Sequence, residues 1–191
     1  MRMAAPATVA SEAGEPGEPP VEDWAVFYDA HFEYVWRSLR RLGVRESALD
    51  DAAQEVFVVA LRRQSQFEGR SSIRTWLFGI ALNRARELAR SERRRAEDEL
   101  PEYLPDVSEP DQEQRAMDTQ ALQLVYHALD ELTEERRALL IMAEVEEMTA
   151  AEIAELLSIP VNTVYSRIRL ARRDFESALK RVRARTPWRV R

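Results

Sequence analysis

The sequence has no cysteine, only 5 glycines and only 2 histidines among its 191 residues. The absence of cysteine excludes disulfides, thiolate catalysis and cysteine-ligated zinc, and it fits a reducing cytoplasm. Few glycines, few β-branched runs and abundant Ala, Leu, Glu and Arg favour helix over sheet. No apolar run approaches the roughly 20 residues that a membrane-spanning helix needs. We therefore expect a soluble, cytoplasmic, all-α protein with no membrane insertion.

Patterns typical of catalysis or cofactor binding are also missing. The sequence contains no glycine-rich phosphate loop, no nucleophile paired with a base and no metal-spaced cluster. His31 and His127 stand far apart, and a lone histidine seldom builds a site. We expect that the protein is not an enzyme and that it has no catalytic residue, metal or cofactor.

The charges are segregated along the chain, which the net charge of −6 conceals. Residues 84–95 include six arginines, and residues 166–191 include ten basic side chains. Between these blocks, residues 96–118 carry nine acidic side chains and a single arginine. Two basic blocks separated by an acidic one indicate contact with nucleic acid more strongly than the overall charge does.

Hydrophobic periodicity and proline content divide the chain into two domains. Residues 1–20, which are acidic and rich in Pro and Gly, predict a disordered tail. Residues 21–95 contain three amphipathic segments and predict a compact helical domain. Residues 96–111 hold three prolines among acidic residues and predict a flexible acidic linker. Residues 112–186 predict a second helical domain.

Three helices are expected in the first domain. The first begins near Val21 and ends at Gly43, which stands where a C-terminal cap is expected. The others cover residues 47–64 and 72–95, with the loop 67–72 between them. The core positions that we predict for them are Leu49, Ala52, Ala53, Val56, Phe57, Ala60 and Leu61, then Ile73, Trp76, Leu77, Ile80 and Leu88.

The second domain is predicted to contain a helix-turn-helix. Thr149 and Glu152 form a capping box before a short helix, and residues 158–160 form a turn before a long basic helix. In such a motif the start of the second helix enters the major groove, where polar side chains read base edges. The candidate readers are Asn162, Thr163, Tyr165, Ser166 and Arg167, and the candidate phosphate contacts are Arg169, Arg172 and Arg173. The alternative is an ordinary helical hairpin with a solvated basic face.

In this order the motifs resemble those of extracytoplasmic-function sigma factors, which belong to the sigma-70 family of bacterial RNA polymerase. LDDAAQEVFVVAL (49–61) followed by FEGRSSIRTWLFGIALNRARELAR (67–90) resembles the N-terminal domain of that family. Residues 128–175 resemble its C-terminal domain. The resemblance covers most of the chain from Val21 to Leu179. Tyr165 is a departure, because the family commonly has Lys at that position.

The resemblance implies a role for each group of residues. Core RNA polymerase would bind Asp50, Asp51, Gln54, Glu55 and Phe57. The −10 element of promoter DNA, with one base flipped out of the non-template strand, would contact Phe67, Gly69, Arg70, Ser71, Ser72, Asn83, Arg84, Arg86 and Arg90. The helix-turn-helix would read the −35 element, and the acidic linker would thread toward the polymerase active centre. An anti-sigma factor is an expected further partner.

Two other functions compete with this interpretation. A stand-alone helix-turn-helix regulator would bind a duplex operator without polymerase, but it would need neither the polar loop nor the acidic spacer. An adaptor that binds only proteins, such as a mimic of a sigma domain, would not need a basic recognition helix.

Overall fold

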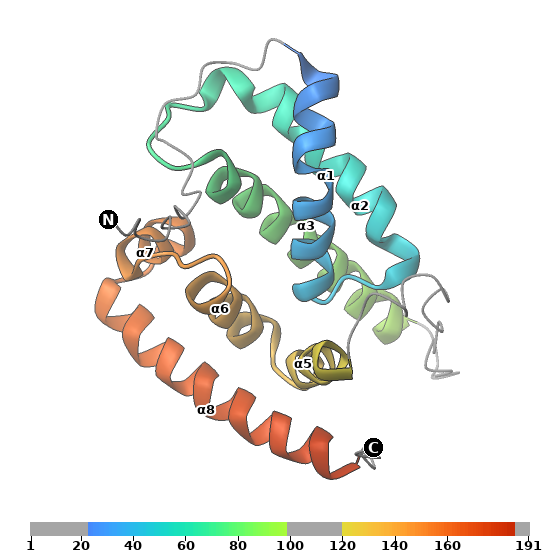
Figure 1. The fold of residues 1–191 in the computed structure, drawn as a ribbon, viewed down its shortest axis with the longest axis vertical. Helices are drawn as coiled ribbons and strands as arrows, with labels where there is room; N and C mark the ends of the chain where they lie inside the picture. Colours follow the sequence, from blue (N-terminus) through green and yellow to red (C-terminus); the bar gives the residue numbers. More distant parts are fainter. Residues whose placement is uncertain (1–22, 99–119, 186–191) are drawn as a thin grey trace, which may run out of the picture.

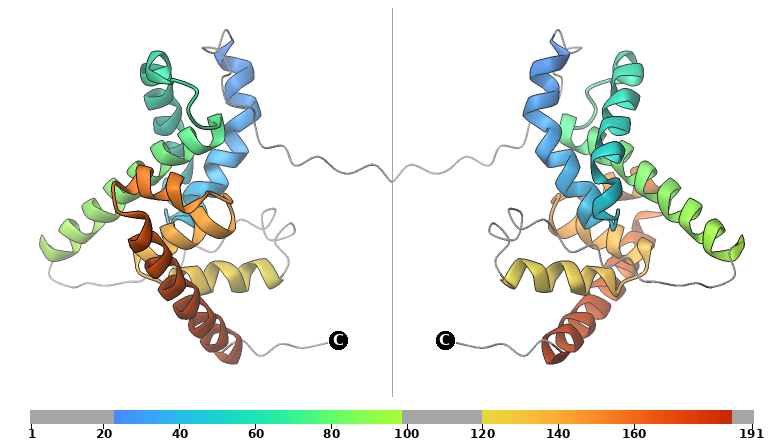
Figure 2. Two further views of the ribbon diagram at one scale, coloured as in Figure 1. Left: turned by 90° about the vertical axis from the view of Figure 1, so that its left-hand side faces the viewer. Right: turned by 90° about the vertical axis from the view of Figure 1, so that its right-hand side faces the viewer.

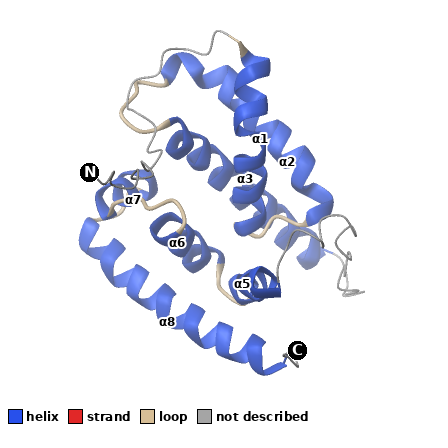
Figure 3. Cartoon of the chain, viewed as in Figure 1, coloured by secondary structure: helices blue, strands red, loops and turns tan. Residues whose placement is uncertain are grey.

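A computed structural model of the chain describes residues 23–98 and 120–185 (Figure 1). Every element in these two ranges is a helix or a loop, which confirms the predicted all-α fold (Figure 3). The predicted tail at residues 1–20 lies outside the described residues, as does most of the predicted linker. The first domain contains α1 (Trp24–Arg41), α2 (Glu46–Arg63), a 3-10 turn (Gln64–Gln66) and α3 (Ile73–Asp98).

Capping sets both ends of α1. The Asp23 carboxylate accepts hydrogen bonds at 2.9 and 3.3 Å from two backbone N–H groups of the first turn, which would otherwise lack an intrahelical partner. At the other end Gly43 has a φ of 92°. Its N–H donates to the carbonyl of Arg40, and the N–H of Val44 donates to that of Leu39. This pair of bonds is a Schellman cap, so the predicted stop at Gly43 is confirmed.

The core of the first domain lies between its three helices. Phe57 of α2 is 5% exposed and packs its ring against those of Phe27, Tyr28 and Phe32 from α1. Edge-on and tilted ring pairs of this kind stabilise a core beyond their area burial. The side chains that are almost fully buried include Val35, Leu39, Leu49, Val56, Leu77, Phe78 and Leu82.

One predicted core position is wrong, and others are only half-buried. Leu61 is 45% exposed, because it directly follows the buried Ala60 and the helical rotation of about 100° per residue turns it away from the core. Ile73, Trp76 and Leu88 are half-buried, whereas Phe78 and Leu82, which we did not predict, are fully buried. The middle of α3 is apolar over a wider arc than a single stripe, because it contacts both α1 and α2.

The second domain contains α5 (Gln120–Asp130), α6 (Glu134–Glu144), α7 (Ala150–Leu157) and α8 (Val161–Arg185). A small hydrophobic cluster joins α5, α6 and α8 through Leu129, Leu140, Ala171 and Ala178. We predicted a helix from residue 112, and the structure describes it from residue 120 onward. No helix in the described ranges is both long and apolar enough to cross a membrane.

The helix-turn-helix forms as predicted. The Thr149 hydroxyl accepts from the N–H of Glu152 at 3.3 Å, and the Glu152 carboxylate accepts from the N–H of Thr149 at 2.7 Å. These reciprocal bonds are the predicted capping box. Ser158 adopts a left-handed conformation with a φ of 53° and ends α7. Ile153 of α7 and Val164 of α8 are fully buried, so the short helix braces the long one.

The two domains pack directly against each other. A single hydrophobic cluster includes Leu39 and Phe78 of the first domain and Ile141 and Ile153 of the second. Figure 1 shows α6 lying between α8 and the helices of the first domain. The interface therefore buries apolar side chains from both sides, and it gives the free chain a defined arrangement of its domains.

Candidate nucleic-acid interface

Five side chains share the outward face of α8, because successive residues of an α-helix are rotated by about 100°. They are Asn162, Tyr165, Ser166, Arg169 and Arg173, and all five are exposed. Tyr165 is 63% exposed, while Val164 and Ile168 on the opposite side anchor the helix in the core. The face combines amide, hydroxyl and guanidinium groups. It therefore offers the donors and acceptors that read base edges and bind phosphates.

Other candidate residues lie on the flanks of α8 and contact α6. Arg167 forms an ion pair with Glu135 at 3.7 Å, and Arg172 forms one with Glu144 at 2.6 Å. Thr163 is half-buried on the same flank as Arg167. The structure thus separates the predicted −35 set into an exposed outward face and flanking residues, of which Arg167 and Arg172 pair with α6. DNA contact by either flanking arginine would compete with its ion pair.

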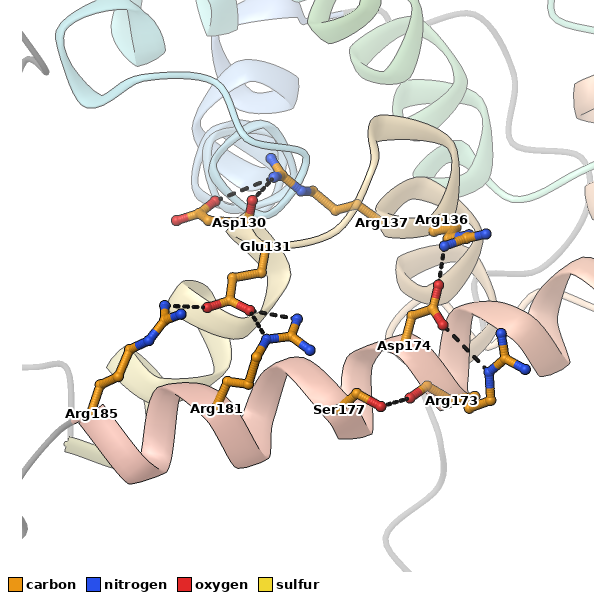
Figure 4. A network of polar contacts seen from close by, with 9 residues as sticks. All are labelled: Asp130, Glu131, Arg136, Arg137, Arg173, Asp174, Ser177, Arg181 and Arg185. Carbon is orange, nitrogen blue, oxygen red and sulfur yellow. Dashed lines mark hydrogen bonds and ion pairs between the residues drawn. The ribbon is translucent and has the colours of Figure 1, made fainter.

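A network of ion pairs holds α8 against α5 and α6 (Figure 4). Asp174 of α8 pairs with Arg136 of α6 and, at 3.5 Å, with its own neighbour Arg173. Farther along the helix, Glu131 pairs with Arg181 at 2.6 Å and with Arg185 at 2.9 Å. Several linked pairs orient a helix better than one exposed pair does. Glu131 also neutralises part of the basic block at the end of α8.

On α3 a second set of polar side chains forms a stripe. Asn83, Arg86, Arg90 and Arg93 follow each other at intervals of three and four residues, which places them on one helical face. They line one wall of a cleft whose other wall is the start of α6. The last turns of α3 project beyond the bundle (Figure 2). We call these four residues the α3 stripe.

Arg84 does not belong to the α3 stripe. Its Nε lies 2.7 Å from a carboxylate oxygen of Glu55, and its side chain is mostly buried between α3 and α2. Glu55 is therefore engaged within the domain as well. Arg93 has the place on the stripe that we assigned to Arg84. The spacing of Asn83, Arg86 and Arg90 could have identified it.

The loop at residues 67–72 is held by both of its ends. The ring of Phe67 packs on that of Trp76 with 5.2 Å between centroids, and the Ser72 hydroxyl accepts from the N–H of Thr75 at 3.1 Å. Gly69 has a φ of 67°, a conformation that most residues avoid. Arg70 is exposed and pairs with Glu68 at 2.5 Å. The Ser72 hydroxyl is thus used as an N-cap of α3, whereas Arg70 projects outward.

The exposed side of α2 carries a separate patch. Asp51 and Gln54 are exposed and lie on one stripe with Val58 and Leu61. Asp50 is also exposed, and its carboxylate accepts from the Trp36 indole N–H at 2.9 Å. Phe57 points to the other side, into the core. The patch is acidic toward the start of α2 and apolar toward its end, and we call it the α2 patch.

A partly buried polar contact joins the two domains. The Tyr34 hydroxyl donates to the Glu146 carboxylate at 2.5 Å. The Arg74 guanidinium lies over the Tyr34 ring, 4.6 Å from its centroid. Burial raises the pKa of the Glu146 carboxyl, while Tyr34, Arg41 and Arg74 lower it in part. Burial, followed by the nearby Glu146 charge, raises the pKa of Tyr34 above its ordinary value. Glu146 Oε1 is buried without a hydrogen-bond partner, so this contact is under electrostatic strain.

Both domains match known protein families in the expected order. Residues 27–95 match Sigma-70 region 2, and residues 122–175 match Sigma-70, region 4. The ECF RNA polymerase sigma-E factor of Haemophilus influenzae is 31% identical over 148 residues, which are 72% of this chain and 77% of that protein. The RNA polymerase sigma-H factor of Pseudomonas aeruginosa is 34% identical over 142 residues, 68% and 72% of the two chains. This chain belongs to the extracytoplasmic-function sigma factors.

Two solved structures share the fold of this chain, and one of them is of a sigma factor. The sigma factor RpoE from Bartonella quintana, in complex with the anti-sigma factor NepR, superposes with a TM-score of 0.67 at 22% identity. That match covers 84% of this chain and 98% of the other. CnrH, in complex with the cytosolic domain of CnrY, superposes with a TM-score of 0.58 at 24% identity over 82% and 87% of the two chains. These superpositions cover both described domains, so the fold of this chain is shared with a solved sigma factor.

The structure brings the candidate residues of this alternative sigma factor into three separate surfaces. The outward face of α8, the α3 stripe with the loop 67–72, and the α2 patch come from different helices. Among His, Cys, Asp and Glu of the described ranges, no group is arranged to hold a metal ion.

Proposed function

We propose that this sigma factor binds core RNA polymerase, recognises the −35 and −10 promoter elements, and promotes strand opening at the start of transcription. The observation that carries the proposal is the presence of two basic faces on two domains that match sigma-70 regions 2 and 4. The chain supplies recognition, and bond formation takes place on the polymerase. In this role it is not an enzyme and acts in the cytoplasm. A stand-alone regulator is not favoured, because the relatives are polymerase sigma factors.

The −35 element is the proposed target of the outward face of α8. Asn162, Tyr165 and Ser166 lie near the start of the helix, where the major groove admits side chains to the base edges. Arg169 and Arg173 follow on the same face, and we assign them to phosphate contacts. Thr163, Arg167 and Arg172 flank this face, and we assign them to the groove margins.

The −10 element is the proposed target of the α3 stripe and the loop 67–72. Arg70 and Ser71 offer donors on the loop, and Asn83 offers both a donor and an acceptor on the stripe. Unstacking one base costs a few kcal/mol, which a fitted pocket repays by hydrogen bonds to the extruded base. Phe67, Gly69 and Ser72 shape the loop. Arg84 supports α3 from behind through Glu55.

Core polymerase is the proposed partner of the α2 patch. Asp51 and Gln54 project from it, and Val58 and Leu61 extend it with exposed apolar surface that a protein partner would cover. Phe57 acts from the core by fixing α2. An anti-sigma factor is a further proposed partner, because the similar sigma factor from Bartonella quintana was solved in complex with an anti-sigma factor.

The proposal is tested on two promoter templates with the double variant Arg70→Ala, Asn83→Ala. One template is fully duplex, and the other has its −10 region already mismatched open. We expect the variant to fail on both, because premelting does not replace the lost contacts to the base. The variant Arg37→Ala, which removes an exposed arginine of α1, is the matched control and should retain activity.

Full transcription by the double variant on the open template would show that these residues act only in melting the DNA. Activity equal to wild type on the duplex template would show that they do not take part in promoter recognition.

A further inference from the structure

A carboxylate of the second domain forms ion pairs with two arginines of the α3 stripe. Glu134, the first residue of α6, has one carboxylate oxygen 2.6 Å from a terminal guanidinium nitrogen of Arg93. Its other oxygen lies 4.0 Å from the Nε of Arg86. The side chains of Arg86 and Glu134 are only 32% and 30% exposed. Their attraction is therefore screened less by salt than that of fully exposed charges.

The cleft around this contact is where a bound DNA strand would have to lie. Its first wall is the α3 stripe, and its second wall is residues 133–136 at the start of α6. A phosphate bound to Arg86 or Arg93 in this cleft would lie beside the Glu134 carboxylate, and two anions repel each other at this distance. Strand binding at these arginines and their contacts with Glu134 therefore oppose each other.

Further contacts within the chain keep α6 in this position. The Arg40 guanidinium of α1 lies 4.3 Å from the centre of the Tyr126 ring of α5, which is within the range of a cation–π interaction. The hydrogen bond between Tyr34 and Glu146 closes the other end of the interface. The arrangement with Glu134 on the stripe is thus one packed conformation, which we call the closed state.

We propose that Glu134 is an intramolecular competitor of −10 DNA. In the free sigma factor its carboxylate occupies Arg86 and Arg93, and separation of the domains releases both arginines to the non-template strand. The apparent affinity for the strand is then the intrinsic affinity multiplied by the fraction of molecules whose domains are separated. The effect on DNA rests on the function proposed above, whereas the closed state and its dependence on Glu134 do not.

The closed state is tested by a distance measurement that needs neither DNA nor polymerase. The chain has no cysteine, so the variant Arg62→Cys, Lys180→Cys takes one spin label on exposed α2 and one on exposed α8. Double electron–electron resonance should give one narrow distance distribution for this labelled parent. Adding Glu134→Arg, which places a cation among the arginines, should add a second and broader population.

Glu135→Arg is the matched control for that measurement. It makes the same charge change one residue later in the same helical turn, but the partner of Glu135 is Arg167 within its own domain, at 3.7 Å. Circular dichroism verifies that each variant keeps its helix content, and Glu134→Gln replaces Glu134→Arg if that variant loses it. An unchanged distance in the Glu134 variant, or equal opening in the Glu135 variant, overturns the proposal.

Competition with DNA is tested by fluorescence anisotropy with a labelled single-stranded dT12. Loss of partly exposed ion pairs changes an equilibrium by a modest factor, so Glu134→Gln should bind the probe about two- to fivefold more tightly than wild type. The gain should be absent from Glu135→Gln, and it should vanish when Glu134→Gln is combined with Arg86→Ala. A gain that persists without Arg86, or no gain at all, contradicts competition at this arginine.

Discussion

Replacing Tyr34 by Phe isolates the polar contact between the two domains. The substitution removes one hydroxyl and keeps the ring that packs beside Arg74. Glu146 Oε2 then loses its donor at 2.5 Å, and Glu146 Oε1 already has no partner. Leaving a buried acceptor unsatisfied costs about 1–3 kcal/mol. For a chain of this length that cost corresponds to a fall in Tm of about 2–12 °C.

The pH dependence of this effect has a definite sign. Burial raises the pKa of the Glu146 carboxyl above its ordinary value of 4.5. A carboxyl with a raised pKa in the folded state stabilises the fold at low pH, and this contribution is lost as the pH rises through the folded pKa. In Tyr34→Phe the lost donor raises that pKa further. The destabilisation should therefore be larger at pH 8 than at pH 5.

Thermal unfolding followed by circular dichroism measures this prediction. Tyr34→Phe, Glu146→Gln and the double variant form a double-mutant cycle with the wild type. Glu146→Gln should be at least as stable as wild type at pH 8 and should lose most of the pH dependence. A Tyr34→Phe effect that is the same at pH 5 and pH 8, or that persists fully in the Glu146→Gln background, would refute the argument.

Three further predictions concern single residues. Gly43→Ala should destabilise the fold by about 1–2 kcal/mol, because the residue has a φ of 92° and a Cβ would overlap the Arg137 guanidinium; urea unfolding measures it, and a neutral result would contradict the cap. Thr149→Ala should cost about 1 kcal/mol through loss of the capping box, and serine at this position should restore the thermal stability. Asn162→Ala should weaken binding to the −35 duplex by about 1–3 kcal/mol and relax the base preference at one base pair. Arg172→Ala should weaken binding to all sequences alike and flatten the salt dependence of binding; a base-specific effect of Arg172→Ala would contradict this division.

Features set by neighbouring residues could be predicted from the sequence. The capping box joins Thr149 and Glu152, and the cap at Gly43 involves only the last turn of α1, so both follow from local backbone chemistry. The apolar period likewise located α1, α2 and α8. Leu61 shows the limit of that period: it directly follows the buried Ala60, and the rotation of about 100° per residue places it on the exposed side of α2 with Val58.

Contacts between distant segments could not be predicted in the same way. Tyr34 and Glu146 are 112 residues apart, and no local pattern at either residue indicates the other. The contacts of Arg86 with Glu134 and of Arg84 with Glu55 also join distant segments. These two arginines belong to one basic block, but they contact different partners. The sequence indicated that the block touches nucleic acid, but it did not separate the arginine that supports α3 from those on its open stripe.

Transcription with purified core RNA polymerase tests the central claim most directly. Core polymerase is supplied with the wild-type chain, with Asp51→Arg on the α2 patch, or with Asp29→Arg, which makes the same charge change on exposed α1, and a supercoiled promoter library is the template. We predict discrete transcripts with wild type and Asp29→Arg, start sites that share −35 and −10 sequences, and a strong reduction with Asp51→Arg. A chain that binds duplex DNA by itself and yields no polymerase-dependent transcript would contradict the account.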